Sequence, residues 1–519
     1  MMRLLEKNHG LMICRVFQHC YSTSTVTTDR SPGQRKVVGI IGGGITGLSA
    51  AYYLVKQHGD KVLPVVFEKA DRVGGWVKTV ITDKGSRYEI GPRSIRPAGI
   101  RGMNTLDMVE DLGLHHNLLY VEKTHPTAQN RYIYLGGKLI KLPTSAKVLY
   151  KRTEPFKGPL FWSILRDLVK FRKKGSDDSI YNFMSRRFGS EIADYLADPL
   201  IRGVCAGDAK KISVKFLMKE MFEHEQNYGS VVLGHFLSKF RKQPCTLSED
   251  DKTIGFSNVA LASLSGNWSI WSLEQGLEML PKALEDYLVT KNNIQLLKSV
   301  DVDRLRLTKD LKKVEVKYGI VGDVKRSDTI VCDHIISCIP APSFAHLLRH
   351  SKPSYPDLWK VFHTIEGESL QVTGLTYNES TVMNDAFGFL VPSCEKSVQG
   401  LLGVVFDSNV FPQEQNTVLS VMSKPGIGIN EIKELVSKTL GIHKEPHDYL
   451  VHENLECIPQ YTIGHYEKVT ALRQYIAFSK LPFTLAGASY DGVSVNDCIY
   501  SARQAVRNIV DYKLGFSDS

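Results

Sequence analysis

The chain has 519 residues, of which 43% are hydrophobic and 23% charged; these are the proportions of a globular protein and exclude a disordered or fibrous chain. This length exceeds one ordinary hydrophobic core, so we expect two or three domains. The nine cysteines are odd in number and form no C-x-x-C pair, which indicates reduced thiols and no metal site. The net charge of +10 would suit nucleic acid, but no recognition motif accompanies it, so no nucleic acid partner is expected.

Residues 1–35 have the composition of a mitochondrial targeting segment. They hold five Lys or Arg residues against two acidic ones, and Ser and Thr are frequent from Ser22 onward. A secretory signal is disfavoured because Arg15 interrupts the apolar run and no small-residue cleavage site follows. An extension without a targeting role is the alternative.

Residues 36–54, KVVGIIGGGITGLSAAYYL, predict a buried strand, a glycine turn and a helix. Gly42, Gly44 and Gly47 fit the pattern G-x-G-x-x-G, whose glycines allow the tight turn, the approach of a pyrophosphate and close helix packing. The positive dipole end of such a helix faces the phosphates. A membrane span is the alternative, because residues 37–55 hold no charge, but the glycines disfavour it.

A second apolar run, Val62–Phe67, ends at Glu68, which stands 21 residues after Gly47. At this place a dinucleotide-binding fold puts a carboxylate that binds the adenosine ribose hydroxyls. An acid here, in place of an arginine, disfavours a 2′-phosphate on the cofactor. The order of strand, glycines, helix, strand and acid predicts a dinucleotide site, with a glycine-rich turn of some other α/β protein as the alternative.

Several motifs resemble one known family. GGGITG at 42–47, FEKADRVGGW at 67–76 and YEIGPRSIRPAG at 88–99 are, in this order, similar to the flavin amine-oxidase superfamily. The last of these motifs resembles its protoporphyrinogen oxidase branch. Three further motifs resemble the animal type of that branch: WSLEQGLEMLP at 271–281, IPQYTIGH at 458–465 and LAGASYDGVSVNDCIYSARQA at 485–505. The resemblance covers almost the whole chain after residue 35.

Residues 147–174 are strongly basic, with nine Lys or Arg residues, two acids and a net charge of +7. Within this stretch, residues 155–173 predict an amphipathic helix with a broad apolar face made of Phe161, Ile164, Leu165, Leu168 and Phe171. Aromatic side chains beside cations suit the headgroup region of an anionic membrane, which predicts a monotopic membrane contact. An ordinary helix packed on its own domain is the alternative.

The remaining elements follow in chain order. In residues 198–214, the small residues around Cys205 leave room for a flat substrate or form a glycine-capped helix end. Residues 243–267 predict a loop or linker, and residues 271–288 predict a helix. Strands are expected at 296–307, 313–318, 334–340 and 484–486, and a C-terminal helix from about Val495.

These elements and the resemblance together predict a mixed α/β fold. It would have a Rossmann-like FAD-binding domain, an inserted substrate domain and a helical membrane-binding domain. We assign residues 36–95, 266–342 and 482–515 to the FAD-binding domain. The mostly helical membrane-binding domain would be residues 125–242, and the substrate-binding domain residues 96–124 with 343–481.

The resemblance implies an oxidase in which noncovalent FAD takes two electrons three times from protoporphyrinogen IX. Oxygen would reoxidise the flavin each time, giving protoporphyrin IX and hydrogen peroxide. The implied cofactor contacts are Gly42, Gly43, Gly44, Ile45, Thr46, Gly47, Glu68, Lys69, Trp76, Gly91, Pro92, Arg93, Ser94, Val302, Ala488, Val493, Ser494 and Val495. No catalytic residue is named, because a flavin can accept hydride at N5 while the protein positions the substrate carbon.

The resemblance also implies substrate contacts at Arg131, Gly203 and Arg93. Arg131 matches an arginine that pairs with a substrate propionate, where a charge-assisted hydrogen bond orients an otherwise apolar macrocycle. A surface arginine is the alternative for Arg131 from the sequence alone.

Location and partners are implied in the same way. The protein would lie peripherally on the intermembrane-space side of the mitochondrial inner membrane, form a homodimer and contact ferrochelatase. Two alternatives remain from the sequence: an oxidase or desaturase of the same superfamily that acts on other substrates, and a non-catalytic escort protein with the same fold. Glu68 and the C-terminal motif disfavour the escort protein.

Overall fold

The computed structural model describes residues 35–143, 149–175, 177–240, 250–291, 293–349, 356–378, 385–411 and 416–512. From Lys36 onward these residues belong to one compact unit. Residues 1–34, which include nearly all of the predicted targeting segment, lie outside the described residues. Within the described ranges, none of the helices combines the length and the hydropathy that a bilayer crossing requires.

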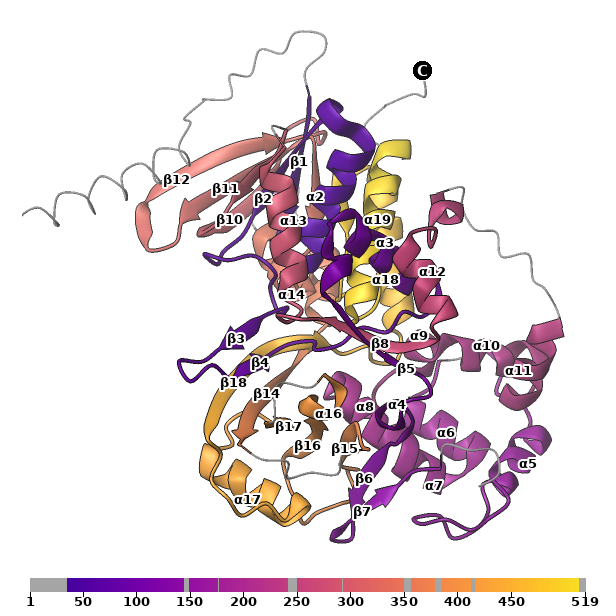
Figure 1. The fold of residues 1–519 in the computed structure, drawn as a ribbon. Coiled ribbons are helices and arrows are strands. Elements are labelled where there is room, and N and C mark those ends of the chain that lie inside the picture. The colour runs from indigo at the N-terminus through magenta and orange to yellow at the C-terminus, as the bar shows by residue number, and fades with distance from the viewer. Residues whose placement is uncertain are drawn as a thin grey trace, which may run out of the picture. The chain divides into compact units, whose positions relative to one another are not determined.

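A five-stranded parallel sheet forms the first of the two large layers of the fold (Figure 1). Its strands, in spatial order, are β19 (Phe483–Leu485), β13 (His334–Ser337), β1 (Lys36–Ile41), β2 (Val62–Phe67) and β9 (Gln295–Leu297). Every neighbouring pair is parallel. Segments that are far apart in the sequence thus build one sheet, which confirms the predicted parallel sheet of the FAD-binding domain.

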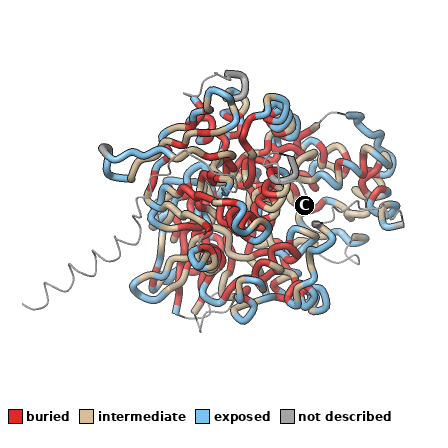
Figure 2. The backbone as a smooth tube through the Cα atoms, turned by 90° about the horizontal axis from the view of Figure 1, so that it is seen from above, coloured by how far each residue is buried: buried red, intermediate tan, exposed pale blue. Residues whose placement is uncertain are grey.

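Both faces of this sheet are buried, as the apolar run of β1 predicts. Val38 and Ile40 face one core, and Val37 and Ile41 face the other. The first core is closed by helices α2 (Ile45–His58), α3 (Gly99–Asp111), α13 (Met279–Val289) and α19 (Val495–Tyr512). The second is closed by strands β10 (Val300–Leu307), β11 (Val314–Ile320) and β12 (Asp323–Cys332) and by helices α14 (Ala341–Leu348), α15 (Pro356–His363) and α18 (His465–Phe478). Figure 2 shows this interior in red.

A seven-stranded sheet forms the second large layer. Its spatial order is β18 (Asp448–Pro459), β14 (Gly367–Tyr377), β17 (Thr417–Ser423), β16 (Leu401–Phe406), β15 (Gly388–Leu390), β6 (Tyr132–Leu135) and β7 (Lys138–Lys141). Helix α17 (Ile429–Leu440) packs its apolar side on this sheet. Strands β6 and β7 fall inside the range 125–242 that was assigned to the helical domain, but β6 pairs with β15 and β7 pairs with β6.

A cluster of helices follows β7. It consists of α5 (Phe161–Val169), α6 (Ile180–Phe188), α7 (Ser190–Ile192), the π-helical turn η4 (Ala193–Ala197), α8 (Asp198–Cys205), α9 (Val214–Leu217), α10 (Lys219–Tyr228) and α11 (Val231–Phe240). A small apolar core lies between them. Arg187 and Asp167, both without solvent exposure, form an ion pair of 2.5 Å that ties α6 to α5.

Three predicted elements differ from the structure. The helix expected at 155–173 spans only Phe161–Val169, so Phe171 lies beyond its end. Residues 271–288 are not one helix, because Trp268–Leu273 form strand β8, which pairs with β5 (Leu118–Glu122) and stacks Trp268 on Tyr120 at 4.1 Å. The loop expected at 243–267 contains the turn η5 (Asp250–Thr253) and helix α12 (Asn258–Ser265), while residues 241–249 lie outside the described residues.

The domain boundaries also differ at α3. Residues 96–124 were assigned to the substrate domain, but α3 packs against α2 and α19 in the first core of the parallel sheet. The remaining short elements are η1 (Gly59–Lys61), β3 (Thr79–Ile81), β4 (Arg87–Glu89), η2 (Leu114–Asn117), α4 (Pro126–Gln129) and α16 (Asp407–Val410).

Candidate functional site

The carboxyl ends of β1, β2, β13 and β19 meet at one edge of the parallel sheet. Gly42 follows β1, Glu68 follows β2, Cys338 follows β13 and Ala486 follows β19. Backbone bonds join these ends, since the Gly42 N–H donates to Phe67 O at 2.9 Å and the Ala486 N–H donates to Ser337 O at 3.0 Å. In open α/β sheets this edge is where ligands bind.

The glycine loop between β1 and α2 has no room for side chains. Gly42 has a φ of +100°, a conformation that other residues rarely adopt. A Cβ atom added at Gly47 would overlap the carbonyl oxygen of Gly42. Gly47 therefore lets the first turn of α2 press against the end of β1, as the predicted motif requires.

The N-terminus of α2 has backbone donors that no side chain caps. Its N-cap residue, Gly44, offers no side-chain acceptor, and the first turn contains no acidic residue. The helix has 14 residues, so its dipole end adds a partial positive charge to these N–H groups. Such a helix end binds phosphate groups without further cations.

Glu68 lies directly in front of the glycine loop. Its Oε2 accepts the Gly43 N–H at 2.7 Å and its Oε1 accepts the Ala70 N–H at 2.8 Å. Both contacts fix the carboxylate at the end of β2 and leave lone pairs on each oxygen for further donors. The position agrees with the ribose-binding role predicted from the sequence, and that role stays a prediction.

A second loop crosses the first. The Gly74 N–H donates to Gly43 O at 2.9 Å, and the Cα atom of Gly44 lies 3.3 Å from the place where a Cβ of Gly75 would be. Trp76 follows with 40% of its surface exposed, and a Cβ added at Gly91 would overlap the Trp76 carbonyl oxygen. The motif at 67–76 is thus in contact with the glycine loop and with the motif at 88–99.

The C-terminal motif reaches the same place. Gly487 has a φ of +98°, and a Cβ there would lie 2.8 Å from Thr46 Oγ1 at the start of α2. Ser494 and Asp497 cap the N-terminus of α19, since Asp497 N–H donates to Ser494 Oγ at 3.1 Å and Ser494 Oγ donates to Asp497 at 2.6 Å. This capping satisfies backbone N–H donors at the start of α19.

The remaining predicted cofactor residues lie around this edge with other contacts. Lys69 forms an ion pair with Asp301 at 2.8 Å on a solvated surface. Val302 is buried in the core next to β2, and Ala488 packs partly against the core of α2 and α19. Pro92, Ser94 and Val493 are half-buried, and Val495 is buried at the start of α19.

Arg131 precedes β6 and carries a charge that no carboxylate neutralises within ion-pair distance among the described residues. One guanidinium nitrogen donates to Thr127 O at 2.7 Å and to Asn130 O at 3.2 Å. The guanidinium lies 4.7 Å from the ring centre of Phe387. Burial lowers the pKa of Arg131, and the charge of Arg96 lowers it further. A partly buried cation without an acidic partner is suited to an anionic ligand.

The three predicted substrate residues converge on β15 and β16. Arg131 covers Phe387, just before β15, and a Cβ added at Gly203 would overlap the side chain of Leu390 at the end of β15. Arg93 pairs with Asp407 at 3.5 Å, directly after β16. The structure thus brings residues 93, 131 and 203 to two paired strands, although Arg93 already has a carboxylate partner.

Two carboxyl groups near Arg93 were not predicted. Glu89 accepts the Leu277 N–H at 3.0 Å, and burial raises its pKa to about 7. Asp407 accepts from Ser420, and burial raises its pKa as well, while the charge of Arg93 opposes this. Nothing in the sequence marks these acids, because only the folded chain buries them beside Arg93.

Comparisons with known proteins identify the family of this chain. The family described as flavin containing amine oxidoreductase matches residues 45–510. The protoporphyrinogen oxidases of Macaca fascicularis and Homo sapiens are each 37% identical to this chain, over 92% of the chain and 98% of each relative. The chain belongs to the protoporphyrinogen oxidase family of flavin-containing amine oxidoreductases. A crystal structure of an Exiguobacterium sp. 255-15 protein shares the fold, with a TM-score of 0.71 and 22% identity over 91% of this chain and 98% of that one.

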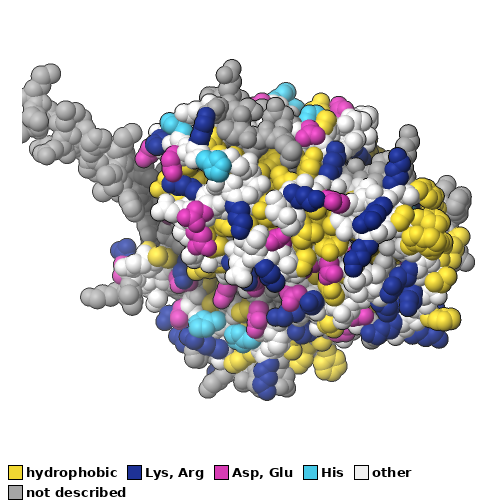
Figure 3. All heavy atoms as spheres, turned by 90° about the horizontal axis from the view of Figure 1, so that it is seen from below, with side chains coloured by type: hydrophobic (Ala, Val, Ile, Leu, Met, Phe, Trp, Pro, Cys, Tyr) yellow, Lys and Arg dark blue, Asp and Glu magenta, His cyan; other side chains and the backbone are white. Residues whose placement is uncertain are grey.

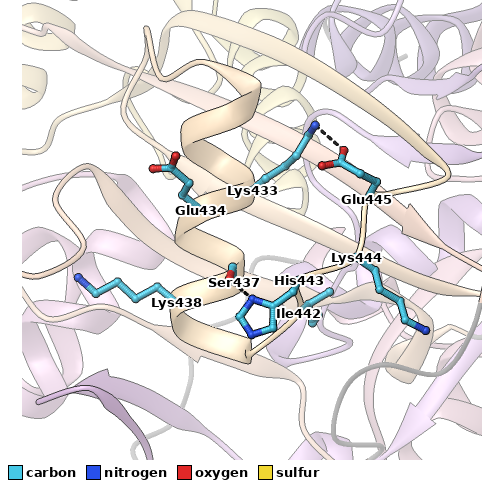
Figure 4. A pocket seen from close by; sticks show the side chains of 8 residues that line it. All are labelled: Lys433, Glu434, Ser437, Lys438, Ile442, His443, Lys444 and Glu445. Carbon is cyan, nitrogen blue, oxygen red and sulfur yellow. Dashed lines mark hydrogen bonds and ion pairs between the residues drawn. The ribbon is translucent and has the colours of Figure 1, made fainter.

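One hollow of about 350 Å³ lies beside α17, lined by charged side chains that include Lys433, Lys438 and Glu445 (Figure 4). Four of the polar side chains that line it are already paired with one another, since Lys433 binds Glu445 at 2.6 Å and Ser437 contacts His443 at 2.7 Å. It contains none of the predicted site residues and does not fit an apolar macrocycle.

Proposed function

We propose that this protein is an FAD-dependent oxidase that converts protoporphyrinogen IX to protoporphyrin IX in haem biosynthesis. The observation that carries the proposal is the conjunction of a dinucleotide edge with an unneutralised, partly buried arginine in a chain of this family. The balanced reaction consumes three O₂ and yields three H₂O₂ for each porphyrin formed.

The residues at the edge of the parallel sheet fit FAD. The uncapped end of α2 and the glycines of the loop leave a backbone surface that a pyrophosphate can approach. Glu68, fixed by two backbone donors, is available to the hydroxyls of an adenosine ribose. We propose that the FAD is bound noncovalently, as the family resemblance implies.

Bound FAD would accept hydride from a methylene bridge of the porphyrinogen and pass the electrons to oxygen. The task of the protein is to present a methylene bridge at the correct distance in each of the three two-electron steps and to orient the macrocycle. Arg131 would bind a propionate and so fix one rim of the substrate. Gly203, beside Leu390, would leave space for the flat ring. The ion pair with Asp407 would fix the orientation of the Arg93 side chain.

Anaerobic mixing of the purified protein with protoporphyrinogen IX tests the proposal. We expect the flavin absorbance to bleach without oxygen, and admission of oxygen to restore it with three H₂O₂ per protoporphyrin. Amines, carotenoids and coproporphyrinogen III, which carries four propionates, serve as competing substrates. Bound FAD that protoporphyrinogen leaves oxidised would contradict the proposed substrate, and a pure protein without flavin would favour the escort alternative.

We further propose that the helical region contacts a membrane surface without spanning it. Trp162, Val169 and Phe171 are exposed by 64%, 76% and 95%, and Lys170, Arg172, Lys173 and Lys174 lie beside them. Leu233, Phe236 and Leu237 of α11 add further exposed apolar area. Figure 3 shows yellow apolar and dark blue basic side chains together on the side where α5 and α11 lie in Figure 1. Such a mixture favours the interface of an anionic membrane.

We also propose the location and the protein partners that the family resemblance implies. They are a place on the intermembrane-space side of the mitochondrial inner membrane, a homodimer and contact with ferrochelatase. Protease protection in isolated mitochondria, sedimentation of the detergent-solubilised protein and cross-linking to ferrochelatase test the three expectations separately.

A further inference from the structure

Helices α10 and α11 form an antiparallel hairpin that buried ionic contacts hold in place. Gly229, with a φ of +79°, ends α10, and Ser230 begins the next turn. Asp167 accepts from Ser230 Oγ at 2.6 Å and from the Val232 N–H at 2.9 Å. Arg187 donates to Gly229 O at 2.7 Å. The hairpin is therefore anchored to α5 and α6 at its turn.

A second anchor fixes the side of α10. Arg186 binds both oxygens of Glu225, at 2.6 and 3.1 Å, and Glu225 is almost fully buried. Bidentate pairs of this kind define the orientation of the two side chains. Residues one turn before Glu225 on α10 consequently have a fixed position relative to α11.

Gly234 allows the two helices to approach closely at His224. A Cβ added at Gly234 would lie 2.5 Å from the Cβ of His224, closer than real Cβ atoms come. His224 is 8% exposed and faces α11, and His235 follows Gly234 in the sequence. The missing side chain at position 234 thus brings two imidazoles from different helices together.

Glu220 completes the group. It stands one turn before His224, and its Oε1 lies 3.9 Å from His224 Nε2. One ligand atom from each of Glu220, His224 and His235 can be chosen so that all three lie within 4.8 Å of one another. Lys219, the residue before Glu220, forms an ion pair with Glu223 at 3.6 Å, a different carboxylate from that of Glu220.

We propose that Glu220, His224 and His235 bind a divalent transition-metal ion of the zinc class. Zn²⁺ takes imidazole nitrogen at about 2.0–2.1 Å and carboxylate oxygen at about 2.0–2.2 Å in a tetrahedral arrangement, which rotamer adjustments of the exposed Glu220 and His235 can reach. Two neutral imidazoles and one carboxylate leave a fourth position for water. Ca²⁺ and Mg²⁺ are disfavoured because they prefer oxygen ligands.

Cysteine spacing in the sequence predicts no metal site. A glutamate and a histidine four residues apart are common on helices, and the third ligand comes into range only through the hairpin. The exposed Leu233, Phe236 and Leu237 lie on the same helix as His235. A metal that cross-links α10 to α11 would therefore fix the orientation of an apolar surface, independently of the oxidase reaction.

Equilibrium dialysis of the untagged, FAD-loaded full chain against micromolar Zn²⁺, followed by metal analysis, tests the proposal. We expect the wild type to retain about one more Zn²⁺ per chain than His235→Ala, and Glu220→Gln to bind at least tenfold more weakly. His346→Ala, which removes an exposed histidine from helix α14, is the matched control and should retain zinc like the wild type. Unchanged FAD content in each variant shows that the fold is intact.

Two further measurements separate a built site from scattered surface binding. Gly234→Ala changes no ligand but separates the helices, and it should weaken zinc binding at least tenfold. Zinc should also slow amide hydrogen exchange in residues 219–240 of the wild type and not of His235→Ala. Equal zinc retention by the wild type and His235→Ala, or weaker binding by His346→Ala to the same extent, would overturn the assignment.

Discussion

At the scale of a single residue, Arg131 carries a partly buried positive charge that has no acidic partner among the described residues. Backbone carbonyls of Thr127 and Asn130 and the ring of Phe387 hold the guanidinium, and none of them cancels its charge. We propose that a tetrapyrrole with two carboxylates on one rim supplies the missing anion. The orientation of a largely apolar substrate then depends on very few polar contacts.

Arg131→Ala should raise KM by about ten- to a hundredfold, because a charge-assisted hydrogen bond worth roughly 1.5–3 kcal/mol is lost. Arg131→Lys should recover part of the loss, since the charge remains and the planar fork does not. Steady-state kinetics with protoporphyrinogen IX give both values, and FAD content should stay normal. Arg306→Ala, on an exposed strand position, is the control. If Arg131→Ala weakened the binding of the dimethyl ester of the substrate as much as that of the free acid, the proposed role of Arg131 as a propionate anchor would be refuted.

Glu89 makes the stability of the protein dependent on pH. Its pKa is raised to about 7 in the folded chain, mainly by burial. The folded state thus favours the protonated acid, so this contribution is complete below the unfolded pKa and is lost as the pH rises through 7. Between pH 5 and 8 the loss amounts to as much as about 3 kcal/mol.

Glu89→Gln, which stays neutral at every pH, should raise Tm relative to the wild type at pH 8 and much less at pH 5.5. Thermal unfolding of the FAD-loaded protein at the two pH values measures the difference. Glu434→Gln, on the exposed side of α17, should give the same Tm difference at both. A Glu89→Gln protein whose Tm relative to the wild type does not change with pH would show that Glu89 ionises normally.

At the scale of elements, the contact of α2 with β1 decides whether the cofactor edge can form. Ala is a better helix former than Gly by about 1 kcal/mol, so Gly47→Ala would stabilise a free helix. In this fold its Cβ meets the Gly42 carbonyl, and the loop must move. We expect Gly47→Ala to lose most of its bound FAD, as measured by absorbance after gel filtration. Gly158→Ala, at an open position, is the control, and a yellow Gly47→Ala protein would contradict the packing argument.

The proposed membrane contact depends on the exposed apolar residues of another element, helix α5, and of the residues that follow it. Replacing Trp162, Val169 and Phe171 by Ser should move the protein from the membrane to the soluble fraction and leave FAD bound. The matched control replaces Val289, Leu455 and Phe478, which are exposed by 67%, 66% and 90% on other elements. Release by both triple variants alike would mean that general hydrophobicity, not this surface, holds the protein to membranes. High salt alone should release it only in part, because apolar contacts are not screened.

Elements with a strong local signal were predictable from the sequence, and elements defined by distant partners were not. The strand, glycine turn and helix at 36–58 and the strand ending at Glu68 depend on neighbouring residues and agree with the structure. Residues 271–273, the end of strand β8, were predicted as helix, because the strand is defined by its pairing with β5. Glu89 and Asp407 could not be found, since their altered acidity arises from burial between elements that are distant in the chain.

At the scale of the whole molecule, the cofactor edge joins the two ends of the described chain. Thr46 near the start and Gly487 near the end are in contact, and Arg473 and Ser501 both bind Asp491 beside that contact. FAD bound there would contact segments from both ends and stabilise their association by mass action. Added FAD should therefore raise the Tm of apoprotein in a concentration-dependent way, which differential scanning fluorimetry measures. A Tm that is independent of FAD concentration would mean that the edge does not hold the cofactor.

The position of β19 in the parallel sheet has a consequence for the time course of folding. β19 pairs with β13, and Phe483 at the start of β19 comes 416 positions after Phe67 at the end of β2. At a synthesis rate of roughly 5–20 residues per second, that interval lasts on the order of 20 to 80 seconds. During this time β1, β2 and the glycine loop exist without the strand and the C-terminal helix that complete their sheet. The emerging chain must keep an unfinished, apolar sheet edge from aggregating, so we expect its yield to depend on chaperones far more than its final stability does.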